Sequence, residues 1–335
     1  MTLPALKILL IISSLVFFSM EAFATQWNVS LWGKRRAFTE HVEKLAELVS
    51  QKTNGTFKLK ISYGGLSKNK ENLDGISIGA FEMAQFCSFY HRAKNPSITV
   101  TELPFLADLS LTQQADISRK IYKHPIVIKD LARWNATLLM PSPLPQYNLI
   151  GVGKAPGKLS EFKGRRIRGP GGITGVLAKL GAIKTSVTAN EVRQAMSSRV
   201  IDIAAFAEHA HIAFGSIEAG KWNTTNLNLG TANCPVVVNT DALAKLSKLH
   251  RDALLSSVDE ALKHYINNYE TKTIRKFQTI VNQKKLAKVT FNAKQVAELN
   301  VLAESVRQEW VKRYSKKFNS NELLQYTTKL FSRKR

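Results

Sequence analysis

The stretch that most constrains the fold is residues 161–172, which read EFKGRRIRGPGG. Residues 165–168 alternate well enough to form a short strand, and the glycines within 169–172 allow backbone conformations that other residues avoid. Residues 173–180 then fit a helix, with Gly181 at its end. The stretch therefore predicts a short strand and a glycine-rich turn that leads into a helix.

Arg168 stands at the end of this expected strand, beside the helix N-terminus. A guanidinium group can form two parallel hydrogen bonds with a carboxylate, so an arginine placed here is suited to holding an anion. The alternative is that Arg168 is one of many basic residues on a solvated strand edge. The glycines after it resemble a phosphate-binding loop, but they lack the Lys-Ser/Thr ending and the spacing of a dinucleotide motif.

The rest of the chain alternates between strand and helix patterns, which predicts an α/β fold with a parallel sheet covered by helices on both faces. Strands are expected at residues 27–32, 57–63, 81–86, 148–152, 200–205, 227–231 and 235–239. Helices are expected at residues 38–49, 72–78, 111–123 and 192–198, the last with a capping box of Thr188 and Glu191. Three prolines within residues 138–145 mark the crossover into a second domain.

The C-terminal part of the chain should be helical. No glycine follows Gly230 and no proline follows Pro235, so both helix breakers are missing from the last third of the sequence. Apolar residues within 254–269 recur on one face of a long helix. Residues 287–291 interrupt the pattern like a strand, and Asn292 then begins a further helix.

Residues 1–24 have the features of a secretory signal peptide. An apolar run at residues 8–18 follows a positive start, and Ala22-Phe23-Ala24 fits a small-x-small cleavage site. The run is too short to span a bilayer. We therefore expect a soluble, exported, periplasmic protein.

The net charge of +23 favours acidic partners. The basic residues are dispersed, however, and we find no zinc-finger or RNA-recognition motif. Because export also separates the protein from nucleic acid, we expect no nucleic-acid role. An exported cationic protein that binds anionic polymers or lipid head groups remains an alternative function.

The two cysteines, Cys87 and Cys234, are expected to be buried free thiols, with a disulfide between them as the alternative in an oxidising compartment. His209 and His211, with Glu208 beside them, could bind a metal as part of a secreted enzyme, but a third convergent ligand is not visible. Neither a nucleophile elbow nor a Walker loop is present. We therefore expect no catalytic residues, no metal and no cofactor.

Several stretches, taken in order, resemble one family: the periplasmic solute-binding proteins of tripartite ATP-independent periplasmic (TRAP) transporters, of the dicarboxylate-binding type. The matching stretches are residues 45–55, 63–66, 72–84, Pro96 with 102–106, 163–171 and 195–202. The stretch at 163–171 is the most specific of them. Glu82 stands where the family usually has aspartate, and Arg199 replaces a common glycine.

The resemblance implies two α/β lobes, an interlobe ligand cleft and long C-terminal helices. Residues 25–147 with 234–275 would form lobe I, and residues 148–233 with 276–330 would form lobe II. It also implies that the protein captures an organic acid and delivers it to the membrane subunits of a TRAP permease, without catalysis. Because some relatives dimerise through their C-terminal helices, we expect a monomer or a homodimer.

In that family the arginine at the position of Arg168 binds the ligand carboxylate. The resemblance and the strand positions suggest six further pocket residues: Trp32, Tyr90, Tyr147, Phe206, Glu208 and Asn233. The alternatives are lobe core for Trp32, Tyr90 and Phe206, a turn for Asn233 and the surface for Glu208. Many relatives carry a second arginine at the start of the second domain, where this chain has Tyr147-Asn148. We therefore expect a monocarboxylate with a polar or aromatic tail rather than an acid held by two arginines.

Overall fold

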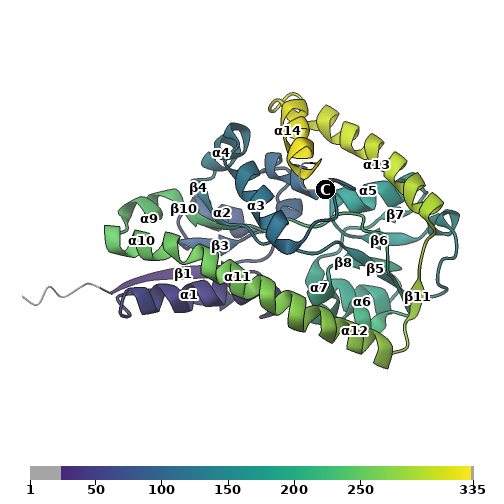
Figure 1. The fold of residues 1–335 in the computed structure, drawn as a ribbon, viewed down its shortest axis with the longest axis horizontal. Helices are drawn as coiled ribbons and strands as arrows, with labels where there is room; N and C mark the ends of the chain where they lie inside the picture. Colours follow the sequence, from purple (N-terminus) through teal and green to yellow (C-terminus); the bar gives the residue numbers. More distant parts are fainter. Residues whose placement is uncertain (1–23, 333–335) are drawn as a thin grey trace, which may run out of the picture.

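The computed structural model describes residues 24–332, so the expected signal peptide lies outside the described residues except for Ala24. Two β-sheets, each covered by helices, form two lobes that lie side by side (Figure 1). We call the part around the first sheet lobe I and the part around the second sheet lobe II. The expected α/β two-lobe architecture is thus present.

The sheet of lobe I has the strand order β2-β1-β3-β10-β4. Its strands are β1 (Thr25–Leu31), β2 (Phe57–Tyr63), β3 (Met83–Gln85), β4 (Ala136–Met140) and β10 (Val236–Asn239). β1 runs parallel to β2 and β3, whereas β10 runs antiparallel to β3 and β4. The prediction of a wholly parallel sheet is therefore wrong, because the chain enters β10 from lobe II and not through a crossover helix of lobe I.

The sheet of lobe II is also mixed, with the order β11-β9-β5-β8-β6-β7. Its strands are β5 (Asn148–Gly151), β6 (Arg166–Arg168), β7 (Ile183–Lys184), β8 (Ile203–Phe206), β9 (Trp222–Thr224) and β11 (Ala287–Val289). β5 is antiparallel to both of its neighbours, β8 and β9. β6 is parallel to β8, which aligns Arg168 with Ala204.

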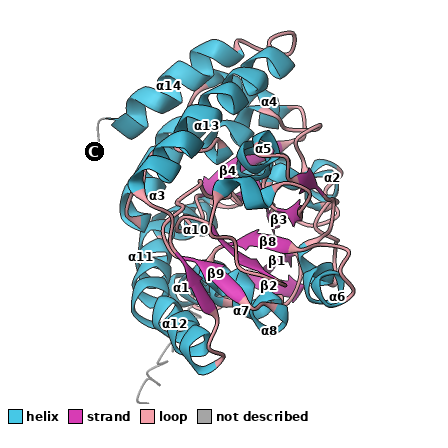
Figure 2. Ribbon diagram, turned by 90° about the vertical axis from the view of Figure 1, so that its right-hand side faces the viewer, coloured by secondary structure: helices cyan, strands magenta, loops and turns pink. Residues whose placement is uncertain are grey.

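Helices cover the faces of both sheets (Figure 2). They are α1 (Glu40–Lys52), α2 (Asn72–Ser77), α3 (Leu111–Tyr122), α4 (Pro125–Ala132), α5 (Gly171–Lys179), α6 (Val192–Ser197), α7 (Glu208–Ala213), α8 (Ser216–Ala219), α9 (Thr240–Lys245) and α10 (Lys248–Ser256). Short 3₁₀ turns include η2 (Ser88–Tyr90) and η3 (Ser97–Glu102). The expected capping box precedes α6, since Glu191 accepts hydrogen bonds from the backbone N–H and the hydroxyl of Thr188.

The C-terminal helices join the lobes. α11 (Val258–Asn268), a π-helical turn (Tyr269–Thr273) and α12 (Ile274–Gln283) form one continuous helical segment that contacts α1 in lobe I and α7 in lobe II (Figure 1). α13 (Ala293–Tyr314) packs on α5, and α14 (Ser320–Ser332) lies against α3 and η3 of lobe I. The expected lobe limits stay a prediction; α14, which we expected in lobe II, contacts α13 as well as α3 and η3 of lobe I.

Residues 227–231 do not form the expected strand. They run as an extended loop that makes single hydrogen bonds to two other segments: Leu229 O accepts from Phe105 N at 3.3 Å, and Gly230 O accepts from Tyr147 N at 2.8 Å. Isolated bonds of this kind satisfy the backbone without building a ladder. The loop therefore connects the lobes instead of extending a sheet.

The two cysteines form a disulfide, so the expectation of free thiols is wrong. Cys87 follows β3 and Cys234 precedes β10, and these two strands are neighbours in the sheet of lobe I. Both cysteines are buried. The antiparallel insertion of β10, which the sequence did not reveal, is what brings the two residues together.

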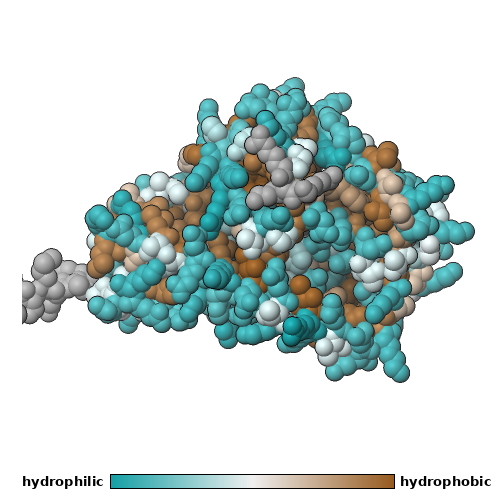
Figure 3. All heavy atoms as spheres, in the orientation of Figure 1, coloured by the Kyte–Doolittle hydropathy of each residue, from teal (hydrophilic) through white to brown (hydrophobic). Residues whose placement is uncertain are grey.

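The surface of the face seen in Figure 3 is largely hydrophilic, with hydrophobic residues scattered among the polar ones. The ion pairs formed by the described residues are spread over both lobes. Between residues 24 and 332 no helix has the length and apolar character needed to cross a membrane.

Candidate ligand-binding site

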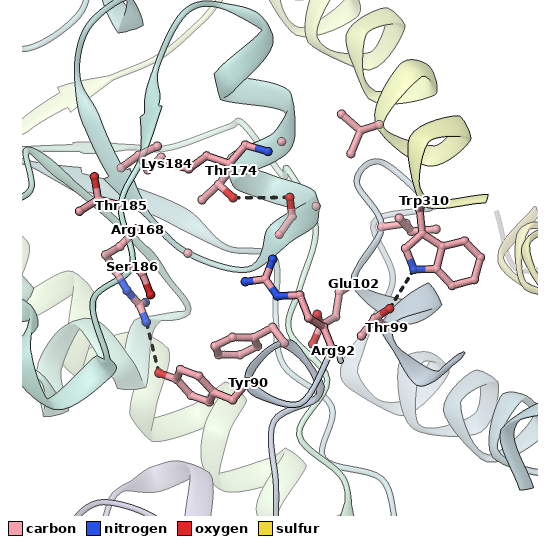
Figure 4. Close-up of a pocket in the computed structure, with 18 of the residues that line it drawn as sticks. Tyr90, Arg92, Thr99, Glu102, Arg168, Thr174, Lys184, Thr185, Ser186 and Trp310 are labelled. Carbon is pink, nitrogen blue, oxygen red and sulfur yellow. Dashed lines mark hydrogen bonds between the residues drawn. The ribbon is translucent and has the colours of Figure 1, made fainter. Parts of the chain in front are cut away.

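Three cavities lie between the lobes, and two of them share the side chains of Phe89 and Tyr90 as a common wall. The larger of these two, which we call the cationic cavity, has a volume of about 460 Å³ (Figure 4). Five basic side chains line it: Lys70, Arg92, Arg168, Lys184 and Arg313. The smaller, which we call the aromatic chamber, has a volume of about 20 Å³. Its walls include Trp32, Phe38, Tyr90, Tyr147, Phe206 and Phe214.

Arg168 ends β6 with only 2% of its surface exposed. Its guanidinium makes three long hydrogen bonds, to Val187 O at 3.3 Å, to Ala205 O at 3.4 Å and to Tyr90 Oη at 3.4 Å. Its central carbon lies 4.2 Å from the centre of the Phe206 ring. Within residues 24–332 it forms no ion pair. A buried positive charge with such weak compensation is suited to receiving a carboxylate.

The two arginines before Arg168 in the chain have structural contacts. Arg166 forms a forked ion pair with Asp202, which directly precedes the neighbouring strand β8, with N–O distances of 2.9 and 2.8 Å. Partial burial raises the pKa of Asp202, but hydrogen bonds from Arg166 outweigh this effect and lower it below its usual value. Arg165 donates to the carbonyl oxygens of Glu161 and Lys154. Of the three arginines, only Arg168 is free to bind an anion.

Tyr90 links the two lobes at the wall between the cavities. Its hydroxyl oxygen accepts a hydrogen bond from Arg168 and another, of 3.1 Å, from the backbone N–H of Ala189 in lobe II. Its ring meets the Trp32 indole edge-on at 5.8 Å. Figure 4 shows Arg168 and Tyr90 joined at the edge of the cavity, with Arg92 reaching into it. A ligand bound to Arg168 would therefore contact both lobes.

The aromatic residues expected at the site gather in the chamber. Trp32 stacks on Phe214 at 5.9 Å with an interplanar angle of 9°, and Phe206 stacks on Phe214 at 5.8 Å. Burial raises the pKa of Tyr147 far above its ordinary value, so its hydroxyl is neutral. The structure thus brings four predicted residues together: Trp32, Tyr90, Tyr147 and Phe206.

Asn233 and Glu208 do not line either cavity. Asn233 lies behind the wall, where its Oδ1 accepts a hydrogen bond of 2.6 Å from Tyr122 Oη. Glu208 begins α7 and accepts a hydrogen bond of 3.3 Å from Tyr269 Oη, and burial raises its pKa. Reaching a ligand would require either side chain to leave these partners.

The histidines next to Glu208 are held by polar neighbours. His209 Nδ1 lies 2.9 Å from Tyr269 Oη. His211 Nδ1 lies 2.6 Å from Ser216 Oγ, and its Nε2 lies 3.2 Å from Asn148 O. Burial lowers the pKa of both imidazoles, to about 3 for His211. The described part of the chain contains no group of three or more His, Cys, Asp or Glu side chains arranged to hold a metal ion.

Glu102 is a site residue that sequence reasoning missed. It lines the cationic cavity although only 4% of its surface is exposed. Burial raises its pKa to about 7, against the opposing effect of hydrogen bonds from Ser88 Oγ and Asn233 N. Its backbone carbonyl touches lobe II, because a Cβ added at Gly172 would lie only 2.1 Å from Glu102 O. No local pattern around residue 102 reveals either contact.

Arg36 is a second residue that the sequence did not single out, since it reads as part of the short basic run at residues 34–36. In the structure only 7% of its surface is exposed. Its Nη1 donates to the carbonyl oxygens of Trp32 at 3.0 Å and Lys34 at 2.8 Å. Burial lowers its pKa to about 10, which leaves the guanidinium charged at neutral pH.

Most of the chain matches one known protein family. Residues 29–317 match the sequence profile of the family described as bacterial extracellular solute-binding protein, family 7 (DctP). The chain belongs to this family. A comparison with functionally curated proteins finds no match.

Solved structures of similar fold include other solute-binding proteins. One, from Rhodoferax ferrireducens in complex with copurified benzoate, has a TM-score of 0.83 at 16% identity, over 92% of this chain and 98% of the other. DctP7 from Bordetella pertussis, which binds pyroglutamic acid, has a TM-score of 0.80 at 20% identity, over 92% and 100% of the two chains. A marine metagenome TRAP protein specific for aromatic acid ligands has a TM-score of 0.82 at 17% identity, over 93% and 99%.

These likenesses confirm the fold expected for this family 7 protein, with two α/β lobes and long C-terminal helices. The family also confirms the expected class of function, the capture of a solute outside the cytoplasm. The family follows from the sequence alone, so the two cavities are separate evidence about the ligand.

Proposed function

We propose that this family 7 protein captures a small organic acid between its lobes in the periplasm and delivers it to the membrane subunits of a TRAP-type permease. The observation that carries the proposal is Arg168. A guanidinium that is 2% exposed and forms no ion pair within residues 24–332 is an anchor for a ligand carboxylate. It contacts Tyr90 of lobe I, so binding there would favour closure of the lobes.

The chamber supports a planar or ring-shaped acid, because aromatic side chains surround the space beside Arg168. Trp32, Phe206 and Phe214 offer ring faces for stacking. Similar solved structures hold benzoate and pyroglutamic acid, which are both ring acids. Because the chamber measures about 20 Å³, the lobes must separate to admit such a ligand.

We propose further that the protein acts by binding alone, without catalysis or cofactor. Its two nearest candidates for catalysis are buried: His209, in the chamber wall, contacts Tyr269, and His211 lies between Ser216 and Asn148. We propose that it works with its permease as a monomer or homodimer, with the lobe limits given above. We propose that Asn233 and Glu208 contact the ligand only after the lobes open and free their side chains.

The test replaces Arg168 with glutamine and measures acid binding to the full mature chain by isothermal titration calorimetry. The acid is first identified by mass spectrometry of small molecules released from the purified wild-type protein. Loss of two charged hydrogen bonds should weaken binding by about 100-fold or more. Arg92→Gln is the matched control, since Arg92 lines the same cavity but is exposed, and it should change affinity less than about threefold.

Two outcomes would contradict the proposal. An acid that binds Arg168→Gln as tightly as wild type would remove the role of Arg168. Binding of anionic polymers or lipid vesicles with steep salt dependence, and without any stoichiometric small acid, would instead favour the alternative function that the net charge of +23 allows.

A further inference from the structure

Arg36 carries hydrogen-bond donors that nothing in the described chain satisfies. Its Nε and Nη2 atoms are buried without a partner, while Nη1 is occupied by two backbone carbonyls of its own loop. It forms no ion pair within residues 24–332. The neighbouring Arg35, by contrast, is exposed and forms an ion pair of 2.6 Å with Glu43. A buried charge with unmade bonds needs an explanation that a surface arginine does not.

The surroundings of Arg36 connect it to the aromatic chamber. Its guanidinium carbon lies 4.3 Å from the ring centre of Trp32, 5.6 Å from that of Phe214 and 5.9 Å from that of Phe38. All three rings line the chamber. Trp32 Nε1 is itself buried without a hydrogen-bond partner. Three unmatched donor atoms, on Trp32 and Arg36, therefore lie together beside the chamber wall.

The titratable groups that pack near Arg36 do not supply a negative charge. Burial, reinforced by the charge of Arg36, lowers the pKa of His41 to about 3, and the same two causes lower that of His209. Burial raises the pKa of Tyr147 and of Tyr265 far above the ordinary value. These groups are neutral at pH 7, so the positive charge of Arg36 meets no partner from them.

We propose that Arg36 binds a second oxygen-bearing group of the ligand, at the end opposite the carboxylate held by Arg168. The ligand would be a compact acid with two acceptor groups, of which a second carboxylate matches the unpaired charge best. This inference rests on the function proposed above. It also revises the expectation of a single arginine clamp: the second arginine comes from the loop after β1 rather than from the start of lobe II.

The two arginines belong to different lobes, so a ligand that binds both of them would hold the lobes together. Arg36 follows β1 of lobe I, whereas Arg168 ends β6 of lobe II. A ligand with acceptors at both ends would bind each lobe through a charged hydrogen bond, so only the closed arrangement would satisfy both. An acid with one carboxylate and a hydrocarbon remainder would leave Arg36 and Trp32 Nε1 unmatched. Arg36 would therefore be a specificity-determining residue.

The experiment uses matched acids, each pair differing only in the second group. The probes are isophthalate and 3-hydroxybenzoate against benzoate, glutarate against pentanoate, and the acid that copurifies with the wild-type chain. Arg36→Met keeps the length of the side chain but removes its charge and its donors. Binding of the two-acceptor acids should weaken by about 10- to 100-fold, while binding of the one-acceptor acids should stay within about threefold.

Arg35→Met is the matched control, because it removes the same charge from the same loop at an exposed position. It should change every affinity less than about twofold. Trp32→Phe removes only one unmatched donor and keeps a ring, so it tests the proposal even where Arg36→Met folds poorly. It should weaken two-acceptor acids by about three- to tenfold. Arg36→Lys, which keeps the charge, should recover part of the loss.

The inference is overturned if Arg36→Met and Trp32→Phe weaken one- and two-acceptor acids equally, or weaken neither. It is also overturned if the copurified acid has a single carboxylate and no other oxygen. Thermal unfolding measured without ligand tests whether Arg36 is needed for stability and not for binding. The unfolding midpoints of Arg36→Met and wild type should agree within about 3 °C. Retained binding by Arg168→Gln would instead contradict the proposed function and leave the Arg36 result to be judged separately.

Discussion

The cationic cavity and the aromatic chamber share a wall, yet they hold positive charge in opposite ways. Arg92, Lys184 and Arg313 in the cavity are exposed, so water compensates their charges at little cost. Arg36 beside the chamber is buried, and so is Arg168, which lines the cavity next to the shared wall; neither forms an ion pair within residues 24–332. Water compensates the exposed charges of the cavity, but it does not compensate these two buried charges.

The difference shows what locates a binding site in a strongly basic protein. With a net charge of +23, basic side chains are expected on any surface or groove. A guanidinium that gives up its hydration without gaining a carboxylate is rare, because the cost of burying it is large. Buried donors without hydrogen-bond partners therefore locate the ligand site better than charge density or cavity volume does.

The largest effect should come from the disulfide in the chamber wall. Replacing both Cys87 and Cys234 with alanine should lower the free energy of unfolding by about 2–5 kcal/mol, because the bridge closes a loop with a sequence separation of 147. Urea unfolding of the oxidised wild type and the double variant measures this loss. The wild type under reducing conditions should match the variant. Equal stability of all three would mean that the bridge does not hold the chamber wall.

The next largest effect is a pH dependence of stability caused by Glu102 in the wall of the cationic cavity. Because burial raises the pKa of Glu102 to about 7 from its ordinary 4.5, the folded chain keeps a proton that the unfolded chain releases in this window. The free energy of unfolding should thus fall as pH rises from about 4.5 to 7, and Glu102→Gln should remove that fall. At pH 8 the variant should be more stable than wild type by at most about 3 kcal/mol.

Glu309 is the control for this pH effect, since it lines the same cavity but is exposed and pairs with Lys179. Hydrogen bonding to Lys179 lowers the pKa of Glu309, so its contribution has the opposite sign and is lost as pH falls. Chemical unfolding at several pH values compares Glu102→Gln with Glu309→Gln. If the free energy of unfolding of Glu102→Gln followed that of wild type at every pH, the pKa of Glu102 would not be raised in the folded chain.

The smallest effect should come from the exposed charges of the cavity. Lys184→Gln with Arg313→Gln should weaken acid binding by less than about threefold, and the change should vanish in about 0.5 M salt, because exposed charges act through a screened field. The loss caused by Arg168→Gln should persist at that salt concentration. Titration at low and high salt provides the measurement. A large, salt-resistant effect of the double variant would assign ligand binding to Lys184 and Arg313 as well as to Arg168.

Elements whose signals are local could be predicted from the sequence. The strand at 57–63 alternates lysines with buried Phe57 and Leu59, and the structure has β2 at these residues. The helix expected after Asn292 begins there, with a reciprocal cap in which Asn292 and Gln295 exchange two hydrogen bonds of 2.9 Å. Arg168 could be proposed from the sequence because its strand and glycine turn are contiguous in the chain.

Features that depend on distant residues could not be predicted in this way. Cys87 meets Cys234 only because β10 inserts beside β3. Arg36 looks like any member of a basic run until Phe214, from the other lobe, covers it together with Trp32. Local patterns do not encode such pairings, so burial of a charge is visible only in the folded chain.

The position of β10 also sets an order on how the chain can fold. β10 lies between β3 and β4 and pairs with both, yet it follows them in sequence after all but one of the lobe II strands. While the chain is being made, β4 thus has no partner in its own sheet until residues 236–239 emerge. Lobe I can then mature only after most of lobe II exists, so the two lobes are parts of one folding unit with a high contact order.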